Sequence, residues 1–245
     1  MVRWIQLCAN GPRGAEDGAA VPLSPGDLGR SVAEAVEAGA CDVHVHPKSP
    51  CGQDTLAPRA VAETLAAVRA VTTVPVGVTT GAWAEADPEE RVARVRSWTV
   101  LPDHASVNWH EPGAESVARA LLERGVGVEA GLWSGTDGAE LFARSPLRGR
   151  VLRVLAEVMD PDPETATVSA RALLTAIGPT EGRPVLLHGQ DGSAWPVLDL
   201  AARLDLLTRI GLEDTLLLPD GQPAPSNAQL VASGLSQYES AHRSS

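Results

Sequence analysis

Short apolar segments alternate with amphipathic segments along the whole chain of 245 residues, and this alternation constrains the fold more than any other feature. The apolar segments have the length of strands, and several are almost entirely apolar, as strands buried on both faces of a parallel sheet should be. The eight expected strands are Trp4–Ala9, Asp42–His46, Pro75–Thr79, His104–Asn108, Gly127–Gly131, Val151–Val158, Pro184–Leu187 and Thr208–Leu212.

The segments between the expected strands carry the start and stop signals of helices. In Ser-Pro-Gly-Asp at 24–27, a capping residue precedes a proline at the first helical position and an acid in the first turn. Asp-Pro-Glu-Glu at 87–90 begins a later helix in the same way. Gly39, Gly125 and Gly178 follow amphipathic segments, where glycine typically ends a helix.

Eight strand–helix units in a chain of this length are close to the ~250 residues typical of a (β/α)8 barrel. A doubly wound open sheet is the alternative, but the even spacing of the units favours closure into a barrel. We therefore expect an α/β fold of the (β/α)8 TIM barrel type, formed by a single domain over residues 1–234. The polar, serine-rich residues 235–245 are expected to form a flexible C-terminal tail.

Composition excludes several classes of partner. No apolar stretch reaches the ~20 residues of a membrane-spanning helix, and Met1–Trp4 lead into a strand without the apolar core of a signal peptide. Cys8, Cys41 and Cys51 lack a Cys-x-x-Cys spacing, which indicates reduced thiols in the cytoplasm. The net charge of −11 argues against nucleic acid binding. We expect a cytoplasmic protein that binds neither membrane nor nucleic acid.

Two histidines lie two positions apart at the end of the expected strand Asp42–His46. Residues i and i+2 of a strand point to the same face, so His44 and His46 present their imidazoles side by side. Pro47 ends the strand because proline has no backbone N–H to donate. An isolated His-x-His more often marks a pair of hydrogen-bonded histidines that bind no metal. Two potential ligands on a rigid strand end are also how a metal site begins, so both alternatives stay open here.

Other polar residues gather where the expected strands end. In a (β/α)8 barrel these ends form the active-site face, so side chains distant in the sequence meet there. Each residue alone could be solvated or satisfied within the core, but their shared position indicates an active site. The group comprises Arg13, Thr79, Thr80, Ser106, Asn108, His110, Glu111, Glu129, His188, Arg209, Glu213 and Asp214.

Tryptophans follow several of the same strand ends. These are Trp83, Trp109, Trp133 and Trp195. The chain otherwise has few aromatic residues, with a single Phe and a single Tyr. These tryptophans could wall the mouth of a pocket or pack beneath loops, and the sequence favours neither alternative.

Five segments resemble the β-keto acid cleavage enzymes, a family that includes the aminohexanoate-cleaving enzyme of lysine fermentation. The resemblance extends from Leu7 to about Val231. The segments are His-Val-His-Pro at 44–47, Thr-Thr-Gly-Ala-Trp at 79–83, Ser-Val-Asn at 106–108, Gly-Val-Glu-Ala-Gly at 127–131 and Arg-Ile-Gly-Leu-Glu-Asp-Thr at 209–215.

Members of this family are zinc-dependent barrels that convert a β-keto acid and acetyl-CoA into acetoacetate and a new acyl-CoA. The resemblance therefore implies bound Zn2+, acetyl-CoA as co-substrate, a small β-keto acid as substrate and association into a homo-oligomer.

The resemblance also implies roles for individual residues. It implies that His44, His46 and Glu213 bind the metal, a donor set that leaves a position open for substrate, as catalytic zinc requires. The other implied residues lie at the same strand ends. They are Arg209, Asp214 and Glu129 in catalysis, and Thr79 or Thr80, Ser106 and Asn108 in binding the keto acid.

The chain departs from the family pattern at three places. Pro-Lys-Ser at 47–49 stands where the family usually has Pro-Arg-Asp, and His-Gly-Gln at 188–190 where it often has His-Gly-Glu. Arg13 stands where the amino-substrate member uses an acid, so we expect Arg13 to bind an anionic or polar substrate tail. If Arg13 instead pairs with Glu129 or Glu111, the pocket is neutral and short apolar keto acids are the better substrates.

In the expected reaction, Asp214 removes the acidic α-proton of the keto acid, and the resulting carbanion attacks the acetyl thioester. CoA then moves to the other carbonyl, and retro-Claisen cleavage releases acetoacetate. Burial would raise the pKa of Asp214 and Arg209 would lower it, and the sequence leaves the balance open. The alternatives are a zinc-dependent hydrolase with His110 and His188 as further ligands, an Fe(II) oxygenase, and a non-catalytic ligand-binding barrel.

Overall fold

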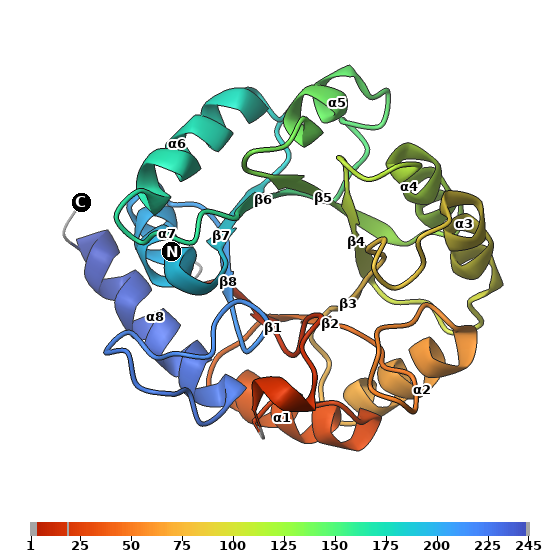
Figure 1. The fold of residues 1–245 in the computed structure, drawn as a ribbon, viewed down its shortest axis with the longest axis horizontal. Helices are drawn as coiled ribbons and strands as arrows, with labels where there is room; N and C mark the ends of the chain where they lie inside the picture. The colour runs from red at the N-terminus through yellow and green to blue at the C-terminus, as the bar shows by residue number, and fades with distance from the viewer. Residues whose placement is uncertain (1–3, 19, 244–245) are drawn as a thin grey trace.

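The computed structural model describes residues 4–18 and 20–243, in which eight parallel strands are surrounded by eight α-helices (Figure 1). The first three residues of the chain and the last two of the expected tail lie outside the described residues. The strands are β1 (Ile5–Cys8), β2 (Asp42–Val45), β3 (Val76–Thr79), β4 (His104–Asn108), β5 (Gly127–Trp133), β6 (Arg153–Val158), β7 (Val185–Gly189) and β8 (Thr208–Ile210).

Each strand is followed by a helix that packs on the outside of the sheet. The helices are α1 (Pro25–Glu37), α2 (Pro58–Arg69), α3 (Pro88–Ser97), α4 (Ala114–Glu123), α5 (Gly138–Arg144), α6 (Ala166–Ile177), α7 (Ala194–Arg203) and α8 (Asn227–Arg243), with short 3-10 turns η1 (Ala15–Asp17) and η2 (Asp191–Ser193).

The sheet has the order β7-β6-β5-β4-β3-β2-β1-β8, and every pairing is parallel. A parallel bridge between Leu186 and Leu207 joins β7 to the start of β8, and the Leu207 N–H donates to Val185 O at 3.1 Å. The predicted (β/α)8 TIM barrel is thereby confirmed, and the C-terminal ends of all eight strands meet at one face.

The helices begin where the capping signals predicted. The Ser24 hydroxyl accepts from the Asp27 N–H at 3.1 Å at the start of α1. The Asp87 carboxylate accepts from the N–H groups of Glu89 and Glu90 at 2.8 and 3.1 Å at the start of α3. Each cap contributes about 0.5–2 kcal/mol to helix stability.

The C-terminal segment differs from the expectation. The tail predicted from Leu235 onward is instead the second half of α8, which continues to Arg243. Leu235 and Tyr238 pack against the core, Ala241 is buried, and Tyr238 Oη donates to Leu206 O at 3.1 Å. Figure 1 shows α8 beside α7 and α1, so this helix closes the outer ring. The serines of this segment lie between the buried residues. The serine-rich composition therefore hid the apolar stripe of the helix from the sequence analysis.

The barrel interior near the N-terminal ends of the strands is polar. A (β/α)8 barrel usually packs branched apolar side chains in its interior. Arg153 donates to Glu129 Oε1 at 2.6 Å and to Asp42 Oδ2 at 3.0 Å. His104 lies 2.9 Å from Asp42 Oδ1 and 3.1 Å from Glu129 Oε2. Gly77 makes room for this network, since a Cβ there would lie 2.1 Å from two atoms of the His104 ring.

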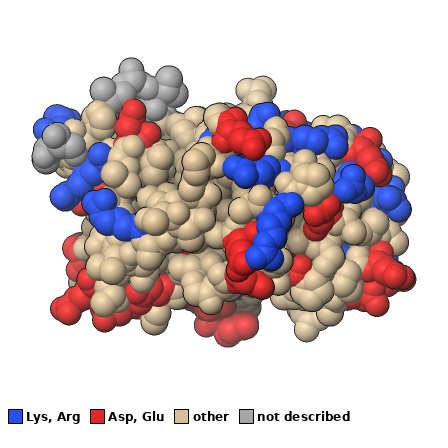
Figure 2. All heavy atoms as spheres, turned by 90° about the horizontal axis from the view of Figure 1, so that it is seen from above, with Lys and Arg blue, Asp and Glu red and all other residues tan. Residues whose placement is uncertain are grey.

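The surface carries charges of both signs. In the side view of Figure 2, Lys and Arg are interspersed with Asp and Glu, and acidic side chains gather along the lower edge. Among the described residues, no helix combines the length and apolar character needed to cross a membrane.

Candidate metal and active site

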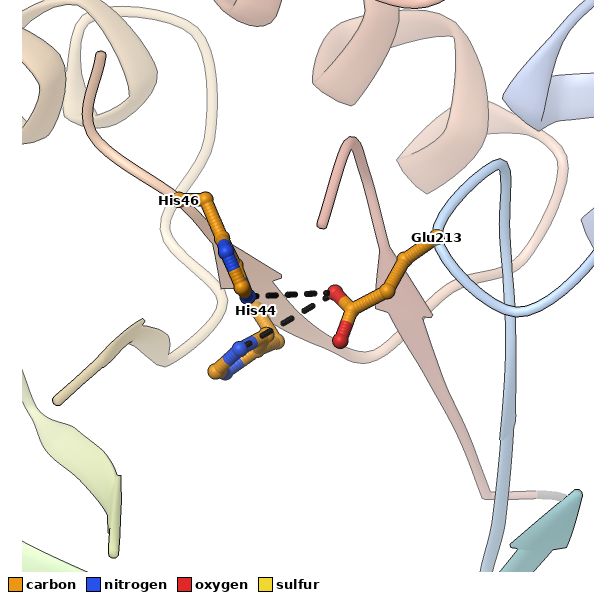
Figure 3. A group of neighbouring side chains, drawn as sticks. All are labelled: His44, His46 and Glu213. Carbon is orange, nitrogen blue, oxygen red and sulfur yellow. Dashed lines mark ion pairs between the residues drawn. The ribbon is translucent and has the colours of Figure 1, made fainter. Parts of the chain in front are cut away.

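His44 on β2, His46 directly after this strand and Glu213 after β8 form one buried cluster at the C-terminal face of the barrel (Figure 3). Glu213 Oε2 lies 3.6 Å from His46 Nε2 and 3.9 Å from His44 Nε2. The two imidazoles meet edge to face with ring centroids 5.2 Å apart. One ligand atom from each residue lies within 4.8 Å of the others, so the three residues could hold a single metal ion.

The hydrogen bonding around this cluster fits a cation. His46 Nε2 and Glu213 Oε2 are buried and have no hydrogen-bond partner in the protein. Burying such groups without a partner is costly, and a bound metal would satisfy both. Two imidazoles and one carboxylate form the donor set of a catalytic zinc site with an open position.

His46 is held by a second set of contacts. Its Nδ1 lies 2.6 Å from Asp54 Oδ2, while Trp83 Nε1 donates to the same oxygen at 2.7 Å. Lys48 donates to Asp54 Oδ1 at 2.5 Å and to the carbonyls of Gly11 and Arg13, so it ties the loop after β2 to the loop after β1. Lys48 therefore has a structural role at this face of the barrel.

The two histidines differ electrostatically. Burial lowers the pKa of His44 to about 4, so its imidazole is neutral at pH 7. Burial also lowers the pKa of His46, but Glu213 and Asp54 outweigh it and raise the value to about 9 in the metal-free protein. A metal must therefore displace a proton from His46.

The turn after β8 places Glu213 and Asp214. Gly211 is required there, because a Cβ would lie 1.9 Å from the carbonyl oxygen of Cys8. This close approach lets the Glu213 N–H donate to Cys8 O at 3.2 Å. Asn227 fixes the turn from α8, since its Oδ1 accepts from the Leu212 N–H at 2.8 Å.

Arg209 joins the two acids. Its Nη2 donates to Glu213 Oε1 at 3.0 Å and to Asp214 Oδ1 at 2.9 Å. The other oxygens, Glu213 Oε2 and Asp214 Oδ2, are buried without partners. Burial raises the pKa of Asp214, but Arg209 and then His188 outweigh it and hold that pKa below its ordinary value. This answers the question that the sequence left open.

His188 on β7 lies beside the same carboxylate. Its Nδ1 is 3.3 Å from Asp214 Oδ1, and its Nε2 is 3.6 Å from Glu157 Oε2. Burial and Arg209 lower the pKa of His188, yet Asp214 raises it above its ordinary value. Glu157 was missed by sequence reasoning, although it lies on the inward-facing side of β6.

Glu129 occupies a different place from the other acids. It lies on β5 beneath the metal cluster, with Oε2 3.9 Å from His44 Nδ1. Burial raises the pKa of Glu129, but His104 and Arg153 outweigh it and hold that pKa well below its ordinary value. Sequence reasoning identified Glu129 but missed His104 and Arg153, which look like ordinary strand residues until the barrel closes.

The hydroxyls expected to bind the keto acid lie on neighbouring strands. Thr79 and Ser106 are register partners on β3 and β4 and are both buried. Thr80 already donates to Ser106 O at 2.6 Å, while Asn108 Nδ2 donates to Glu111 Oε1 at 2.9 Å.

Arg13 lies at the mouth, where expected, but its guanidinium is already paired. It donates to Asp191 Oδ1 at 2.7 Å and to Glu213 O at 3.3 Å, and lies 3.5 Å from Asp17. Among the described residues, its ion pairs are with Asp191 and Asp17 and not with Glu129 or Glu111, the partners considered from the sequence. The arginine joins the loop after β1 to η2.

The tryptophans divide into two groups. Trp83 and Trp133 lie next to each other with ring centroids 6.3 Å apart, and Trp83 also stacks on His46. Trp109 is buried against Phe142 in the core, and Trp195 donates to Leu217 O on the outer side. Both alternatives considered from the sequence therefore occur in the same protein.

Two cavities lie among the loops that follow the strands. One of about 1300 Å³ runs between the loops after β1 and β2 and includes Lys48, Asp54 and Trp83 in its lining. The other, of about 490 Å³, lies against Trp133 between α5 and α6.

Solved structures share the fold. ObcA, in a ternary complex with a C4-CoA adduct and oxalate, matches with a TM-score of 0.67 and 15% identity over 87% of this chain and 62% of its own. Type I 3-dehydroquinate dehydratase from Clostridium difficile matches with a TM-score of 0.65 and 14% identity, over 99% and 93%. This chain therefore spans less than two thirds of the length of ObcA. No curated protein matches the sequence.

The family resemblance is borne out across nearly the whole chain. The model of the family described as beta-keto acid cleavage enzyme matches residues 3–131 and 139–244, which include His44, His46 and Glu213. The chain belongs to the beta-keto acid cleavage enzyme family.

Proposed function

We propose that this protein is a zinc-dependent enzyme that converts a β-keto acid and acetyl-CoA into acetoacetate and an acyl-CoA. One observation carries the proposal: the two acids held by Arg209 each keep one buried oxygen free, beside two imidazoles. Glu213 Oε2 faces the histidines, and Asp214 Oδ2 is free to accept a proton. Arg209 would thus position both a metal ligand, Glu213, and a proton acceptor, Asp214.

His44, His46 and Glu213 would hold the zinc, which would polarise the ketone of the keto acid and offset negative charge developing on it. Thr79 and Ser106 present adjacent polar side chains on the inner face of the barrel and would orient the carboxylate of the substrate. Substrate held in this way would expose its α-carbon to the side of the barrel that carries Asp214.

Asp214 would take the α-proton on Oδ2. Arg209 keeps the carboxylate ionised at neutral pH and holds its second oxygen fixed. His188 lies against Asp214 Oδ1, where it would stabilise the negative charge of the carboxylate. Its imidazole would itself be able to gain or lose a proton there. The carbanion left on the substrate attacks the acetyl thioester, after which CoA transfer and carbon–carbon cleavage give the two products.

Acetyl-CoA needs room beside the reacting atoms. The cavity of about 1300 Å³ borders Asp54 and Trp83, which contact His46 directly. It exceeds the ~300–1,000 Å³ typical of small-molecule sites, so it suits a co-substrate as long as CoA. We place the CoA arm there, and the family's tendency to associate makes a homo-oligomer our expectation.

The hydrolase alternative required further histidine ligands. Among the described residues, the group that could bind a metal contains only His44, His46 and Glu213. His110 packs on Trp133 with ring centroids 4.7 Å apart, and His188 lies against Asp214. This arrangement favours acyl exchange over hydrolysis.

The test is to incubate the protein with acetyl-CoA and a panel of β-keto acids, and to measure the formation of acetoacetate. Elemental analysis should find one zinc per chain in the wild type, where iron would favour the oxygenase alternative. His46→Ala should lose metal and activity, while His110→Ala should keep its metal. Full zinc in His46→Ala, or keto acid consumption without acetyl-CoA, would contradict the proposal.

A further inference from the structure

A row of aromatic rings begins at His46 and continues along the ends of the neighbouring strands β3, β4 and β5. Trp83 stacks on His46 with ring centroids 5.9 Å apart and planes 9° from parallel. Trp133 stacks on Trp83 at 6.3 Å, and His110 lies 4.7 Å from Trp133. Trp83 is 45% exposed, which is unusual for a tryptophan in a large protein. A molecule bound at the metal cluster would therefore meet an apolar aromatic surface.

The row ends at a cavity. Trp133 lines the space of about 490 Å³ between α5 and α6, which has the size of a small-molecule pocket. Trp133 Nε1 is buried without a partner. Asp160 is the one charged residue among the described residues of the lining, and its carboxylate already accepts from Thr165 and Ser169. Among the other lining residues are the apolar side chains of Ala139, Met159, Ala172, Leu173 and Ala176.

The same region departs from the family pattern. The family model matches residues 3–131 and resumes at residue 139, so it omits the end of β5 and the following loop. The omitted residues 132–138 include Trp133 and three further residues that line the cavity. Residues that perform a shared reaction lie within the matched part, whereas this omitted segment is a place where substrate preference can differ.

The positive charge of Arg13, in the loop after β1, is neutralised by neighbouring acids. Arg13, the cation that the sequence singled out for binding a substrate tail, is held by Asp191 and Asp17. A substrate tail with a carboxylate would have to break these contacts to gain an ion pair. An uncharged tail loses nothing by lying against the tryptophans instead.

We propose that Trp83, Trp133 and the cavity beside Trp133 form the subsite for the acyl tail of the β-keto acid, and that this tail is aromatic or bulky and apolar. The inference rests on the proposed function and names its substrate class. In a β-keto acid the tail and the carboxylate leave opposite sides of the ketone. With the carboxylate near Thr79 and Ser106 and the ketone at the metal cluster, the tail follows the tryptophan row.

The test compares β-keto acids whose ketone carries a phenyl, an ethyl, a carboxyethyl or an aminoalkyl group. Wild-type protein should show the highest kcat/KM with the phenyl substrate. Trp133→Leu and Trp133→Ala should each lower the phenyl-to-ethyl ratio of kcat/KM by about tenfold or more, since lost packing of this size has that effect on specificity. Trp195→Ala is the matched control, because this tryptophan lies outside the row, and the ratio should not change.

Binding separates this inference from the proposed function. Calorimetry without acetyl-CoA should give a dissociation constant for the phenyl acid that is tighter than for the ethyl acid, and Trp133→Leu should remove the difference. If no acid reacts with acetyl-CoA but this difference is found, the proposed function fails and the subsite stands. A wild-type preference for the carboxyethyl or aminoalkyl acid, or equal ratios in wild type and Trp133→Leu, would overturn the subsite.

Discussion

His46 Nδ1 lies 2.6 Å from Asp54 Oδ2, and this contact determines which nitrogen of His46 faces the metal cluster. With Nδ1 donating to the carboxylate, Nε2 is directed toward Glu213. Carboxylates that accept from a ligating histidine in this way fix its tautomer and raise its basicity. The loop after β2 therefore belongs to the metal site, although it supplies no ligand.

Asp54→Asn should weaken zinc affinity by about 10–100-fold, because the amide is a poorer acceptor for His46 Nδ1–H. Competition with a chromophoric chelator measures the affinity. Glu63→Gln is the control, since Glu63 lines the same large cavity on α2 without contacting His46. Unchanged affinity in Asp54→Asn would show that Glu213 and the strand alone position the imidazole.

Asp214→Asn should retain zinc and substrate binding but lower kcat by about 10²–10⁴-fold, since an amide cannot accept the α-proton. Arg209 would still hold Glu213, so the metal cluster should persist. Elemental analysis and steady-state kinetics on one preparation provide both measurements. Near-normal turnover would move the base to another residue, and Glu129 is then the next candidate.

Arg13→Glu should change the order of preference among charged keto acids very little, because the wild-type guanidinium is engaged by Asp191 and Asp17. The expected effect is a loss of stability, as the loop after β1 is separated from η2. Kinetics with carboxyethyl, ethyl and aminoalkyl substrates measure the order. A reversal that favours the aminoalkyl substrate would restore the role expected from the sequence, in which Arg13 selects an anionic tail.

The polar network beneath the cluster should make stability depend on pH. Burial lowers the pKa of His104, but Glu129 and Asp42 outweigh it and raise the value from 6.5 to about 9. Protonated His104 therefore stabilises the fold fully below pH 6.5, and this contribution is lost as pH rises to about 9. The contribution is worth roughly 2–4 kcal/mol.

Urea unfolding of the wild type and His104→Gln at several pH values provides the test. The free energy of unfolding should be higher for the wild type than for the variant, and this difference should be largest at pH 6. The difference should be smaller at pH 9. A difference that stays constant between these values would mean that His104 is neutral in the folded protein.

Local sequence signals predicted the strands and the first and third helices well, because each depends on residues close in the chain. The His-x-His spacing places His44 and His46 on one face at the end of β2 for the same reason. Glu213 entered the predicted metal group only through the family resemblance, and Asp54 and Trp83 were not assigned to it. Their contacts with His46 depend on how two loops fold over the barrel mouth, which no local pattern records.

The sequence by itself determined the eightfold alternation, the barrel that follows from it and the strand ends where polar residues gather. Only the tertiary structure decided which of those residues are free to act. Barrel closure gave Arg13 its distant partner Asp191, enclosed Glu129 with His104 and Arg153, and left Asp214 Oδ2 unpaired. The reason is physical: the state of a buried charge is set by neighbours within a few ångströms, and in a barrel most of these come from distant parts of the chain.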